Sequence, residues 1–459
     1  MNHLYFLTVS SLQLLKKCFV IPILATISAF LFYYIFIYKS FNLSSILSIV
    51  GPRSIYDKDN SNFPPLIGYQ KSDEKNDIIY ILAWTRRFHA IIPEEQIENC
   101  ARISQAKCRI VNSRQFLNRS AALLFHARDV ILFSDIPPSR YQNQHYVFYN
   151  HESPLLTRVP LQGAVQKSFF DWTMTYRLDS TIYCPYAYFQ SLSHASSYAK
   201  TQYEDSTGVR LETDLDKRPK LIAWFVSNCE THSKREKYVY ELRKYIPIDI
   251  YGQCGELTCE KQQRQKCMQL LSKTYKFYIG FENSVCQDYI SEKFTQRLDL
   301  NLVVIVLRRS DYEKLVPSFP DHVLEEIENR TNQNLITNDP WKNLRQKHKK
   351  SWWFFIAADD FDNPKHLSDY LYFLHQNSQI YLNYFEWRKY WRVVIAGDQH
   401  CNCELCAKLY EEREEFRKNK QKGQEQKNLM ANFDIHEWWN VGTCDQEFAA
   451  KLLQKSPIK

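Results

Sequence analysis

Glycine is scarce in this sequence, with 10 of 459 residues. No G-x-G-x-x-G, Walker A, H-E-x-x-H or G-x-S-x-G motif occurs. The sequence therefore lacks the main signatures of four enzyme classes: dinucleotide dehydrogenases, P-loop kinases, zincin proteases and α/β-hydrolases. The formal net charge of +8 is modest for this length, and no basic helix or stripe stands out. We therefore expect no nucleic-acid partner, although the charge would suit an anionic small molecule.

One long run without charge stands near the N-terminus. Cys18–Tyr38 comprises 21 uncharged residues, which as a helix would span about 32 Å, close to the thickness of a bilayer core. Lys16 and Lys17 precede it, which favours a cytosolic N-terminus. A cleaved signal peptide is the alternative, but no small-residue cleavage site follows the run. We expect a cytosolic tail (1–17), an uncleaved type II signal anchor (18–38) and a stem (39–76), with the remaining chain in a lumen.

The cysteine count fits that compartment. Of 13 cysteines one lies in the anchor, and the remaining twelve are an even number, as a disulfide framework requires. Three close cysteines could form a metal knuckle, but no fourth ligand has zinc-finger spacing, so we expect disulfides there and in a second cluster. The clusters are Cys401, Cys403 and Cys406, and Cys254, Cys259 and Cys267. The sequons at Asn118 and Asn329 are candidate N-glycosylation sites.

Apolar runs alternate with helical patterns in two series, which predicts an α/β fold. The first series has strand signals at 78–84, 121–133 and 146–150. The second has strand signals at 221–227, 248–252, 275–282 and 302–307, with helical patterns at 234–245, 260–272 and 289–300. We expect two Rossmann-like domains facing a cleft. Their expected bounds are 77–200 and 220–400, joined by a linker at 201–219 and followed by a cysteine-containing tail at 401–459.

Several long motifs occur in a fixed order. The most specific is YKFYIGFENSVCQDYISEKF, Tyr275–Phe294, preceded by AWFVSNC…YGQCG at 223–255. The others are FHARD (125–129), YNHESP (149–154), FDWTMTYRLDS (170–180), FIAADDF (355–361), LNYFEWR (382–388) and CELC (403–406). Over roughly residues 78–410 the chain resembles the α1,3-fucosyltransferase family, with similarity to its invertebrate members. The resemblance implies a GT-B arrangement, a type II Golgi membrane enzyme, GDP-fucose as donor and a GlcNAc-containing glycan as acceptor.

The reaction implied by this resemblance is a single inverting displacement. It needs a general base for the acceptor hydroxyl and positive charge for the departing GDP. The resemblance assigns the base to Glu152, just beyond the strand signal at 146–150. Taken alone, a glutamate here is more often a loop or helix-entry residue. The catalytic interpretation therefore depends on the motif.

The resemblance also assigns the donor-binding residues. Arg235 and Lys293 would stabilise the diphosphate, and Arg235 is counted as catalytic for this reason. Glu292 would accept hydrogen bonds from the ribose, Tyr289 would pack on the guanosine and Asn283 would support the turn. The adjacent Lys234-Arg235 pair could exchange roles after a one-residue slip in alignment. The segment around Glu292 also fits a plain helix N-terminus capped by Asp288 or Ser291, and both interpretations can hold together.

On the acceptor side, Trp172 and Tyr176 could offer an apolar face to a sugar ring. Core packing is the competing interpretation for both. Arg177 and Asp179 are expected to form a local ion pair. Two histidines near strand ends, His126 and His151, are expected to be structural residues.

Departures from the family pattern bear on the donor site. No D-x-D pair lies in a matching position, so basic side chains should carry the diphosphate. We expect no required cofactor and assign no metal ligands, although Mn²⁺ could stimulate the reaction. Leu307–Ser310 replaces a glycine- and proline-containing turn and adds positive charge that would suit a diphosphate. The charged insertion between Pro317 and Ser351 is expected to be a surface loop.

Two questions stay open at this point. The acceptor could be an antennal LacNAc or LacdiNAc unit, or the core GlcNAc of an N-glycan. An inactive relative that binds GDP or a glycan as a scaffold is the alternative to an enzyme.

Overall fold

The computed structural model describes residues 66–67, 78–98, 100, 102, 107–129, 136–141, 144–157, 168–192, 218–334, 339–421 and 433–454. The chain divides into two compact units, Met1–Pro65 and Leu66–Lys459, and the described residues all belong to the second. The expected cytosolic tail (1–17) and signal anchor (18–38) lie outside the described residues, as do most of the expected stem and linker. Among the described residues, we find no helix that is both long and apolar enough to cross a membrane.

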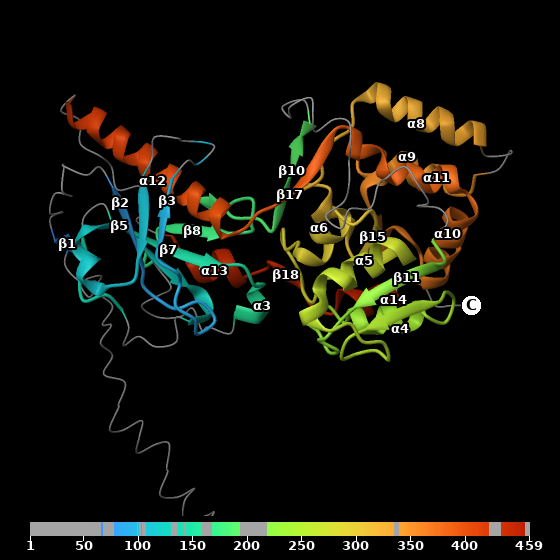
Figure 1. Cartoon of the computed structure of the whole chain (residues 1–459), viewed down its shortest axis with the longest axis horizontal. Coiled ribbons are helices and arrows are strands. Elements are labelled where there is room, and N and C mark those ends of the chain that lie inside the picture. The colour runs from blue at the N-terminus through green and yellow to red at the C-terminus, as the bar shows by residue number, and fades with distance from the viewer. Residues whose placement is uncertain are drawn as a thin grey trace, which may run out of the picture. The chain divides into compact units, whose positions relative to one another are not determined.

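The first half of the described chain forms a seven-stranded sheet, in the order β3-β4-β2-β5-β7-β8-β9 (Figure 1). Its described pairings are parallel except between β3 and β4. The strands are β2 (Ile79–Ala83), β3 (Glu95–Ile97), β4 (Cys108–Val111), β5 (Ser120–His126), β7 (His145–Asn150), β8 (Trp172–Thr175) and β9 (Ile182–Tyr183). The strands expected in the first series are confirmed, although the one expected at 121–133 ends at His126 and passes into the 3-10 helix Ala127–Asp129.

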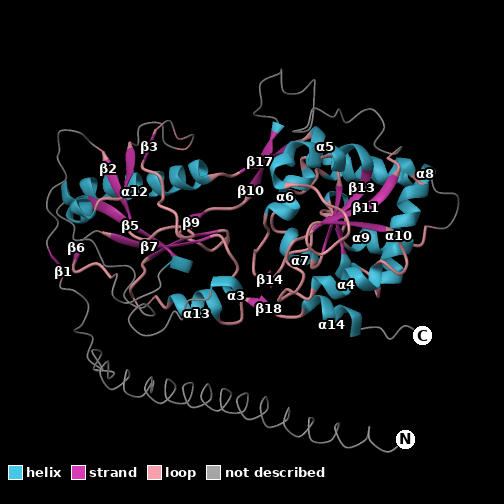
Figure 2. Cartoon of the chain, turned by 60° about the horizontal axis from the view of Figure 1, so that its bottom comes forward, coloured by secondary structure: helices cyan, strands magenta, loops and turns pink. Residues whose placement is uncertain are grey.

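Each face of this sheet has its own cover, which explains why its strands are continuous apolar runs. On one face, Ile81 packs in the same cluster as Leu405 of α12 (Asp398–Gln421). On the other face, Leu82 packs in the same cluster as Trp439 of α13 (Ile435–Asn440). Figure 2 shows both helices beside the strands of this sheet. The C-terminal segment thus returns to complete the core of the first sheet.

The second half forms a five-stranded sheet whose order is β12-β11-β13-β15-β16, with parallel pairing throughout. Its strands are β11 (Lys220–Phe225), β12 (Ile248–Tyr251), β13 (Tyr275–Ile279), β15 (Val303–Val306) and β16 (Ile356–Ala357). The helices between and around them include α4 (Arg235–Leu242), α5 (Arg264–Thr274), α6 (Glu292–Leu298) and α10 (Pro364–Gln376). This alternation confirms the second predicted series, and the two halves together confirm the α/β fold.

The insertion expected to be a surface loop is instead largely helical. It contains α8 (Asp321–Asn334) and α9 (Lys342–Lys347). Val323 and Ile327, one helical turn apart, are buried in the core of the second half. This apolar spacing was present in the sequence, and the high charge of the segment obscured it. Asn329 lies exposed on α8, and Asn118 lies in the 3-10 helix Arg114–Arg119, so glycosylation of either stays a prediction.

Short strands carry the chain between the two halves. The outgoing β10 (Ala187–Ser191) pairs antiparallel with the returning β17 (Trp391–Ile395), and they lie side by side in Figure 1. Near the end of the chain, β18 (Cys444–Asp445) pairs with β14 (Val285–Cys286). The other elements are β1 (Leu66–Ile67), β6 (Arg140–Tyr141), α3 (Pro154–Thr157), α7 (Arg309–Tyr312), α11 (Ser378–Leu382), α14 (Phe448–Gln454) and the 3-10 helices Lys261–Gln263, Trp352–Phe354, Ala358–Asp360 and Asn383–Lys389.

The expected disulfide framework is confirmed. All twelve cysteines outside the predicted anchor are paired, so neither cysteine cluster has free thiols for a metal. The bonds are Cys100–Cys403, Cys108–Cys406, Cys184–Cys401, Cys229–Cys254, Cys259–Cys267 and Cys286–Cys444. Three of them join the first turns of α12 to the first half of the chain, and Cys286–Cys444 joins β14 to β18.

Candidate functional site

Glu152 lies in the turn that follows β7, at the carboxyl end of a central strand of the first sheet. Its backbone N–H donates to the side-chain oxygen of Asn150, 3.1 Å away. The Asn150 amide in turn donates to the Thr157 hydroxyl in α3, at 2.8 Å. These short-range bonds give the turn its local shape. They leave the partly buried Glu152 side chain at a strand end, as expected for a ligand site in a parallel sheet.

The surroundings of Glu152 suit a general base. Burial raises the pKa of its carboxyl, while the positive charges of Lys293 and Arg128 lower it and the negative charge of Glu292 raises it further. The net effect is a raised pKa. A carboxylate with a raised pKa is a stronger proton acceptor than an exposed one.

The segment from β13 to α6 forms a closed local network around Glu282. The buried Glu282 carboxylate accepts a hydrogen bond from the Ser291 N–H at 2.7 Å and from the Ser291 hydroxyl at 2.8 Å. Ser291 is the N-cap of α6, as one of the two sequence alternatives predicted, and its side chain accepts from the Lys293 N–H. Asp288 instead accepts hydrogen bonds from the Leu178 N–H and from Lys314.

Lys293 is held inside this network. Its ammonium lies 3.1 Å from Glu282 Oε2 and 3.3 Å from Glu292 Oε1, and it donates to the Ser291 hydroxyl at 2.8 Å. Burial disfavours the charge, but the carboxylates of Glu282 and Glu292 outweigh it and the pKa of Lys293 is raised. Burial likewise opposes charge on Glu292, and the positive charge of Lys293 reverses this, so the pKa of Glu292 is lowered. The site therefore holds a fixed cation beside two anions.

Arg235 is the first residue of α4 and points back toward the same segment. It is 4% exposed, and its guanidinium donates to the Phe281 carbonyl at 2.5 Å. Lys234 instead pairs with Glu230 at 3.3 Å. Of the two adjacent cations, Arg235 is thus the one that reaches the donor motif. Its Nε atom is buried and has no hydrogen-bond partner within the described part of the chain.

Asn283 and Tyr289 lie within the same motif. The Asn283 carbonyl accepts from the Ser233 N–H at 3.0 Å, while its side-chain oxygen is buried and unpartnered among the described residues. Tyr289 is 3% exposed, and its ring centroid lies 5.0 Å from that of Tyr176. The unpartnered atoms of Arg235 and Asn283 are polar groups that a ligand could satisfy.

The turn at residues 150–153, called the base turn because it carries the predicted base, directly contacts the motif at residues 275–294, called the donor motif because it carries most of the predicted donor-binding residues. The Ser153 hydroxyl donates to the Ser284 hydroxyl at 2.9 Å, and both serines are fully buried. These residues stand next to Glu152 and Asn283 in the chain. The structure therefore brings together the predicted base, its neighbours and the predicted donor-binding residues.

The two predicted acceptor residues are both largely buried. The Trp172 ring stacks on the imidazole of His145, with centroids 3.8 Å apart, and is 6% exposed. Tyr176 is 2% exposed and contacts the rings of Tyr289 and Trp439. Its hydroxyl has no hydrogen-bond partner among the described residues. Core packing accounts for most of the surface of both side chains, and their role with an acceptor stays a prediction.

A small pocket lies beside this region. Tyr176 forms part of its wall, together with residues that precede and follow Tyr289 in the chain. Its lining residues are Tyr176, Leu178, Tyr183, Pro185, Ala187, Asp288, Ile290, Asp311, Lys314 and Leu315. It is therefore lined by both halves of the described chain.

Two other sequence expectations can be compared with the geometry. The ion pair between Arg177 and Asp179 is confirmed, with two hydrogen bonds of 2.9 and 2.6 Å. The sequence suggested that the extra positive charge of the Leu307–Ser310 turn would suit a diphosphate. In the structure Arg309 instead forms an ion pair with Asp360 at 2.6 Å. Arg308 pairs in the same way with Asp311 at 2.8 Å. These two arginines are neutralised within the protein.

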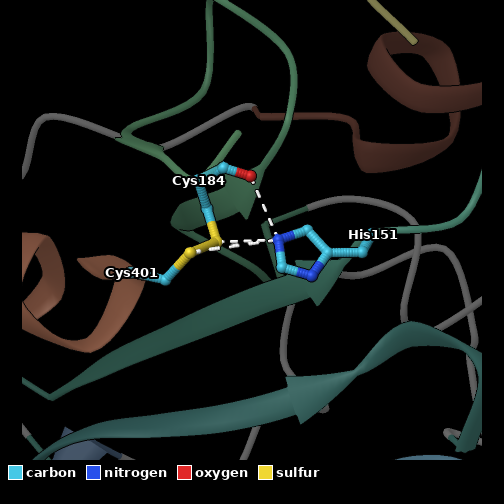
Figure 3. A group of neighbouring side chains, drawn as sticks. All are labelled: His151, Cys184 and Cys401. Carbon is cyan, nitrogen blue, oxygen red and sulfur yellow. Dashed lines mark hydrogen bonds between the residues drawn. A yellow bond between two sulfur atoms is a disulfide. The ribbon is translucent and has the colours of Figure 1, made fainter. Parts of the chain in front are cut away.

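The histidines near the strand ends both have protein partners. His126 Nδ1 lies 2.6 Å from Asp129 Oδ2. His151 lies against Cys184 and Cys401, and within the described residues these three are the group that could by composition hold a metal. The two cysteines form a disulfide with each other, so in this state they offer no thiolate (Figure 3).

Sequence reasoning missed Glu282 and the contact between Ser153 and Ser284. Glu282 stands within the quoted motif, directly before Asn283. A glutamate at the end of a mostly apolar strand run was the available signal, because a buried charge needs a partner. No local signal pointed to the serine contact, which joins residues 131 positions apart.

Comparison with known proteins agrees with this site. Residues 76–187 match the family described as "Fucosyltransferase, N-terminal". Residues 215–323 and 327–425 match "Glycosyltransferase family 10 (fucosyltransferase) C-term". The chain therefore belongs to the glycosyltransferase family 10 fucosyltransferases, the α1,3-fucosyltransferase family that its motifs resemble.

Individual relatives of the chain are also named as fucosyltransferases. The chain is 31% identical over 354 residues to glycoprotein 3-α-L-fucosyltransferase A of Drosophila melanogaster, covering 74% of this chain and 57% of that protein. It is 27% identical to α-(1,3)-fucosyltransferase fut-6 of Caenorhabditis elegans, covering 91% and 95%. It is 30% identical to a 4-galactosyl-N-acetylglucosaminide 3-α-L-fucosyltransferase of Pan troglodytes, covering 77% and 84%. The chain thus spans little more than half of the Drosophila relative.

Among solved structures, a crystal structure of an α1,3-fucosyltransferase with GDP-fucose resembles the chain with a TM-score of 0.38 and 15% identity. The alignment covers 72% of this chain and 84% of that one.

Proposed function

We propose that this chain is an inverting glycosyltransferase that moves L-fucose from GDP-β-L-fucose in α1,3 linkage to GlcNAc of glycoprotein or glycolipid glycans. The observation that carries the proposal is the direct contact between the base turn and the donor motif, through Ser153 and Ser284. It brings the carboxylate with the raised pKa, Glu152, into the electrostatic field of the cation Lys293. A base and a leaving-group cation are the two groups that a single displacement requires.

Each residue has a defined task in this proposal. Glu152 accepts the proton of the acceptor hydroxyl as that oxygen attacks the anomeric carbon. Lys293 and Arg235 stabilise the negative charge that develops on the GDP oxygens. Glu292 binds the ribose, Tyr289 packs on the guanosine and Asn283 orders the turn.

The arrangement of ligands follows the GT-B scheme. The donor lies at the carboxyl ends of the second sheet, and the acceptor enters from the carboxyl ends of the first. Trp172 and Tyr176 are proposed to shape the acceptor side. No cofactor is required in this scheme, and a titration with Mn²⁺ and EDTA would reveal any stimulation by metal.

A location follows from the N-terminal sequence. We place residues 18–38 in the Golgi membrane as a single-pass type II anchor, with the catalytic part in the lumen. Protease protection in intact microsomes tests this orientation, because a lumenal catalytic part resists digestion until detergent is added.

The activity is tested by a transfer assay. Full-length protein in detergent-solubilised membranes receives GDP-fucose and a panel of LacNAc, LacdiNAc and a paucimannose N-glycan, with mass spectrometry as the readout. A gain of one deoxyhexose on GlcNAc establishes the activity and the acceptor class. The alternative function, an inactive scaffold that binds GDP or a glycan, requires no transfer to any acceptor although GDP still binds.

A further inference from the structure

The helix α12 is joined by disulfides to both edges of the first sheet. Cys100 and Cys108, bonded to Cys403 and Cys406, lie at the β3–β4 edge. Cys184, bonded to Cys401, directly follows β9 at the opposite edge. The three bonds share one helix but hold different parts of the sheet.

Within the described part of the chain, the Cys184–Cys401 bond is the one of these three that contacts the turn carrying Glu152. The contact is made by His151, the residue immediately before Glu152. Its Nε2 atom lies 3.0 Å from the Cys184 carbonyl oxygen, 2.8 Å from Cys184 Sγ and 3.9 Å from Cys401 Sγ (Figure 3). The ring thus packs on the disulfide itself.

The protonation state of His151 fits a hydrogen bond to that carbonyl. Burial and the charge of Arg87 lower the pKa of His151 to about 4, against the raising effect of the Cys184 carbonyl. The imidazole is therefore neutral near pH 7 and carries one N–H. With the proton on Nε2, the ring donates to the Cys184 carbonyl.

The backbone of His151 is tied to the same segment. Tyr186, two residues after Cys184, donates its hydroxyl to the His151 carbonyl at 2.6 Å. The rings of Tyr186 and His151 also lie 5.4 Å apart. Both the side chain and the carbonyl of His151 are thus bound to residues 184–186, and that segment is fixed to α12 by its disulfide.

We propose that His151 and the Cys184–Cys401 disulfide are positioning residues for Glu152, fixing the backbone from which the base reaches the acceptor hydroxyl. This inference rests on the proposed function. The bonds of the turn around Asn150 and Thr157 set its local shape, whereas His151 is the link that fixes the turn relative to the segment after β9. A misplacement of a catalytic group by about 1 Å can cost about a hundredfold in rate.

The chain offers a matched control for the test. Removing Cys184–Cys401 (Cys184→Ala/Cys401→Ala) is compared with removing Cys100–Cys403 (Cys100→Ala/Cys403→Ala). The two bonds join residues 217 and 303 positions apart, and each removes one covalent link between α12 and the first sheet, so Tm is measured in both variants to separate lost stability from lost kcat. Both variants remove one link to the same helix, but the first alone removes the link that fixes the segment bound by His151.

Two further variants leave all disulfides intact. His151→Phe removes the N–H donor, while His151→Gln keeps an N–H₂ near the place of Nε2. The readouts for the full-length chain are kcat, the KM for GDP-fucose, GDP affinity, Tm and the pH profile of kcat/KM.

We expect the Cys184–Cys401 pair variant and His151→Phe to lower kcat by about ten- to a hundredfold, with the KM for GDP-fucose and GDP affinity nearly unchanged. Burial raises the pKa of Glu152, so a loosened turn that lets water in should lower this pKa. The acid limb of kcat/KM then moves to lower pH in these variants. His151→Gln should retain most of the rate, and the Cys100–Cys403 variant should lose Tm but keep both kcat and the acid limb.

Equal loss of kcat in the two disulfide variants, or wild-type kcat and acid limb in His151→Phe, would overturn the inference. If the Cys184–Cys401 variant does not fold, the contrast between His151→Phe and His151→Gln decides. Failure of the proposed function gives different results. Full turnover in Glu152→Gln would show that Glu152 is not the base, and no transfer by the wild type would show that the chain lacks the proposed activity.

Discussion

The base turn and the donor motif are held in place by different kinds of contact. In the donor motif, Glu282, Ser291 and Lys293 bind one another within a span of twelve residues. In the base turn, His151 depends on Cys184 and on a disulfide to Cys401, which lies 250 positions away in the chain. The network around Lys293 is thus built from neighbours in sequence, and the turn that carries Glu152 is held by distant segments.

This difference affects how each region should respond to substitution. A local network tolerates distant changes but fails when one of its own members is lost. A site held by distant segments can lose its geometry although its own residues are intact. The predictions below test this contrast, beginning with the largest expected effect.

The largest effect is expected for Glu152→Gln. The amide cannot accept the acceptor proton as a base, so transfer should fall by about 10²–10⁴-fold. GDP affinity should be nearly unchanged, because the donor network does not include Glu152. Kinetics with a reactive acceptor and calorimetry with GDP measure the two effects. A variant that turns over at the wild-type rate would remove Glu152 as the base.

The next effect is expected for Lys293→Ala. In the proposed site Lys293 binds the diphosphate, so the loss of that one charge-assisted hydrogen bond should weaken GDP-fucose binding by about 1.5–3 kcal/mol. The measurement is the KM for GDP-fucose together with GDP affinity. Lys365→Ala serves as the control, because Lys365 makes an exposed ion pair with Asp369 on α10. Unchanged binding in Lys293→Ala would show that this ammonium does not contact the donor.

A smaller effect is expected for Glu282→Gln. The amide can still accept from Ser291, but the charge that raises the pKa of Lys293 and fixes its position is lost. The KM for GDP-fucose should rise about three- to tenfold, within the range of coupling between neighbouring charges. In the double variant with Lys293→Ala, the effects should be less than additive. Full additivity would mean that Glu282 acts independently of Lys293.

The same contrast explains what the sequence could predict. The predicted donor-binding residues from Asn283 to Lys293 stand in one continuous motif, and the apolar runs around them marked β13 and β15 correctly. The Ser291 cap followed from ordinary helix-start chemistry. These features could be predicted because the residues that form them are close together in the sequence.

The remaining features depended on contacts between distant segments. The cover of the first sheet by α12, the link between His151 and Cys184, and the stack of Trp172 on His145 join residues that are far apart or on different strands. An even cysteine count predicted disulfides, but it carries no information on their pairing. In the insertion, the charge of α8 obscured a buried apolar stripe that includes Val323 and Ile327.

The smallest effect concerns the other long-range tie of the first half, at His145. Its imidazole lies 2.7 Å from Asp171 and 2.5 Å from Glu412, and so joins β7 to α12. Burial opposes the charge of His145, but these two carboxylates outweigh it and raise its pKa to about 9. A folded-state pKa above that of the unfolded chain means that the stabilisation is complete below about pH 6.5 and disappears as the pH rises through about 9.

His145→Gln should therefore lower the free energy of unfolding by roughly 1–2 kcal/mol at pH 6 and by progressively less toward pH 10. Denaturant unfolding of the variant and the wild type at a series of pH values measures the difference. His322→Gln is the control, because His322 lies exposed in the first turn of α8. A difference that does not vary with pH would mean that His145 stabilises the fold only by packing on Trp172. The tie between α12 and the first sheet would then rest on its disulfides and apolar contacts, because the ion pairs of His145 would add no stability of their own.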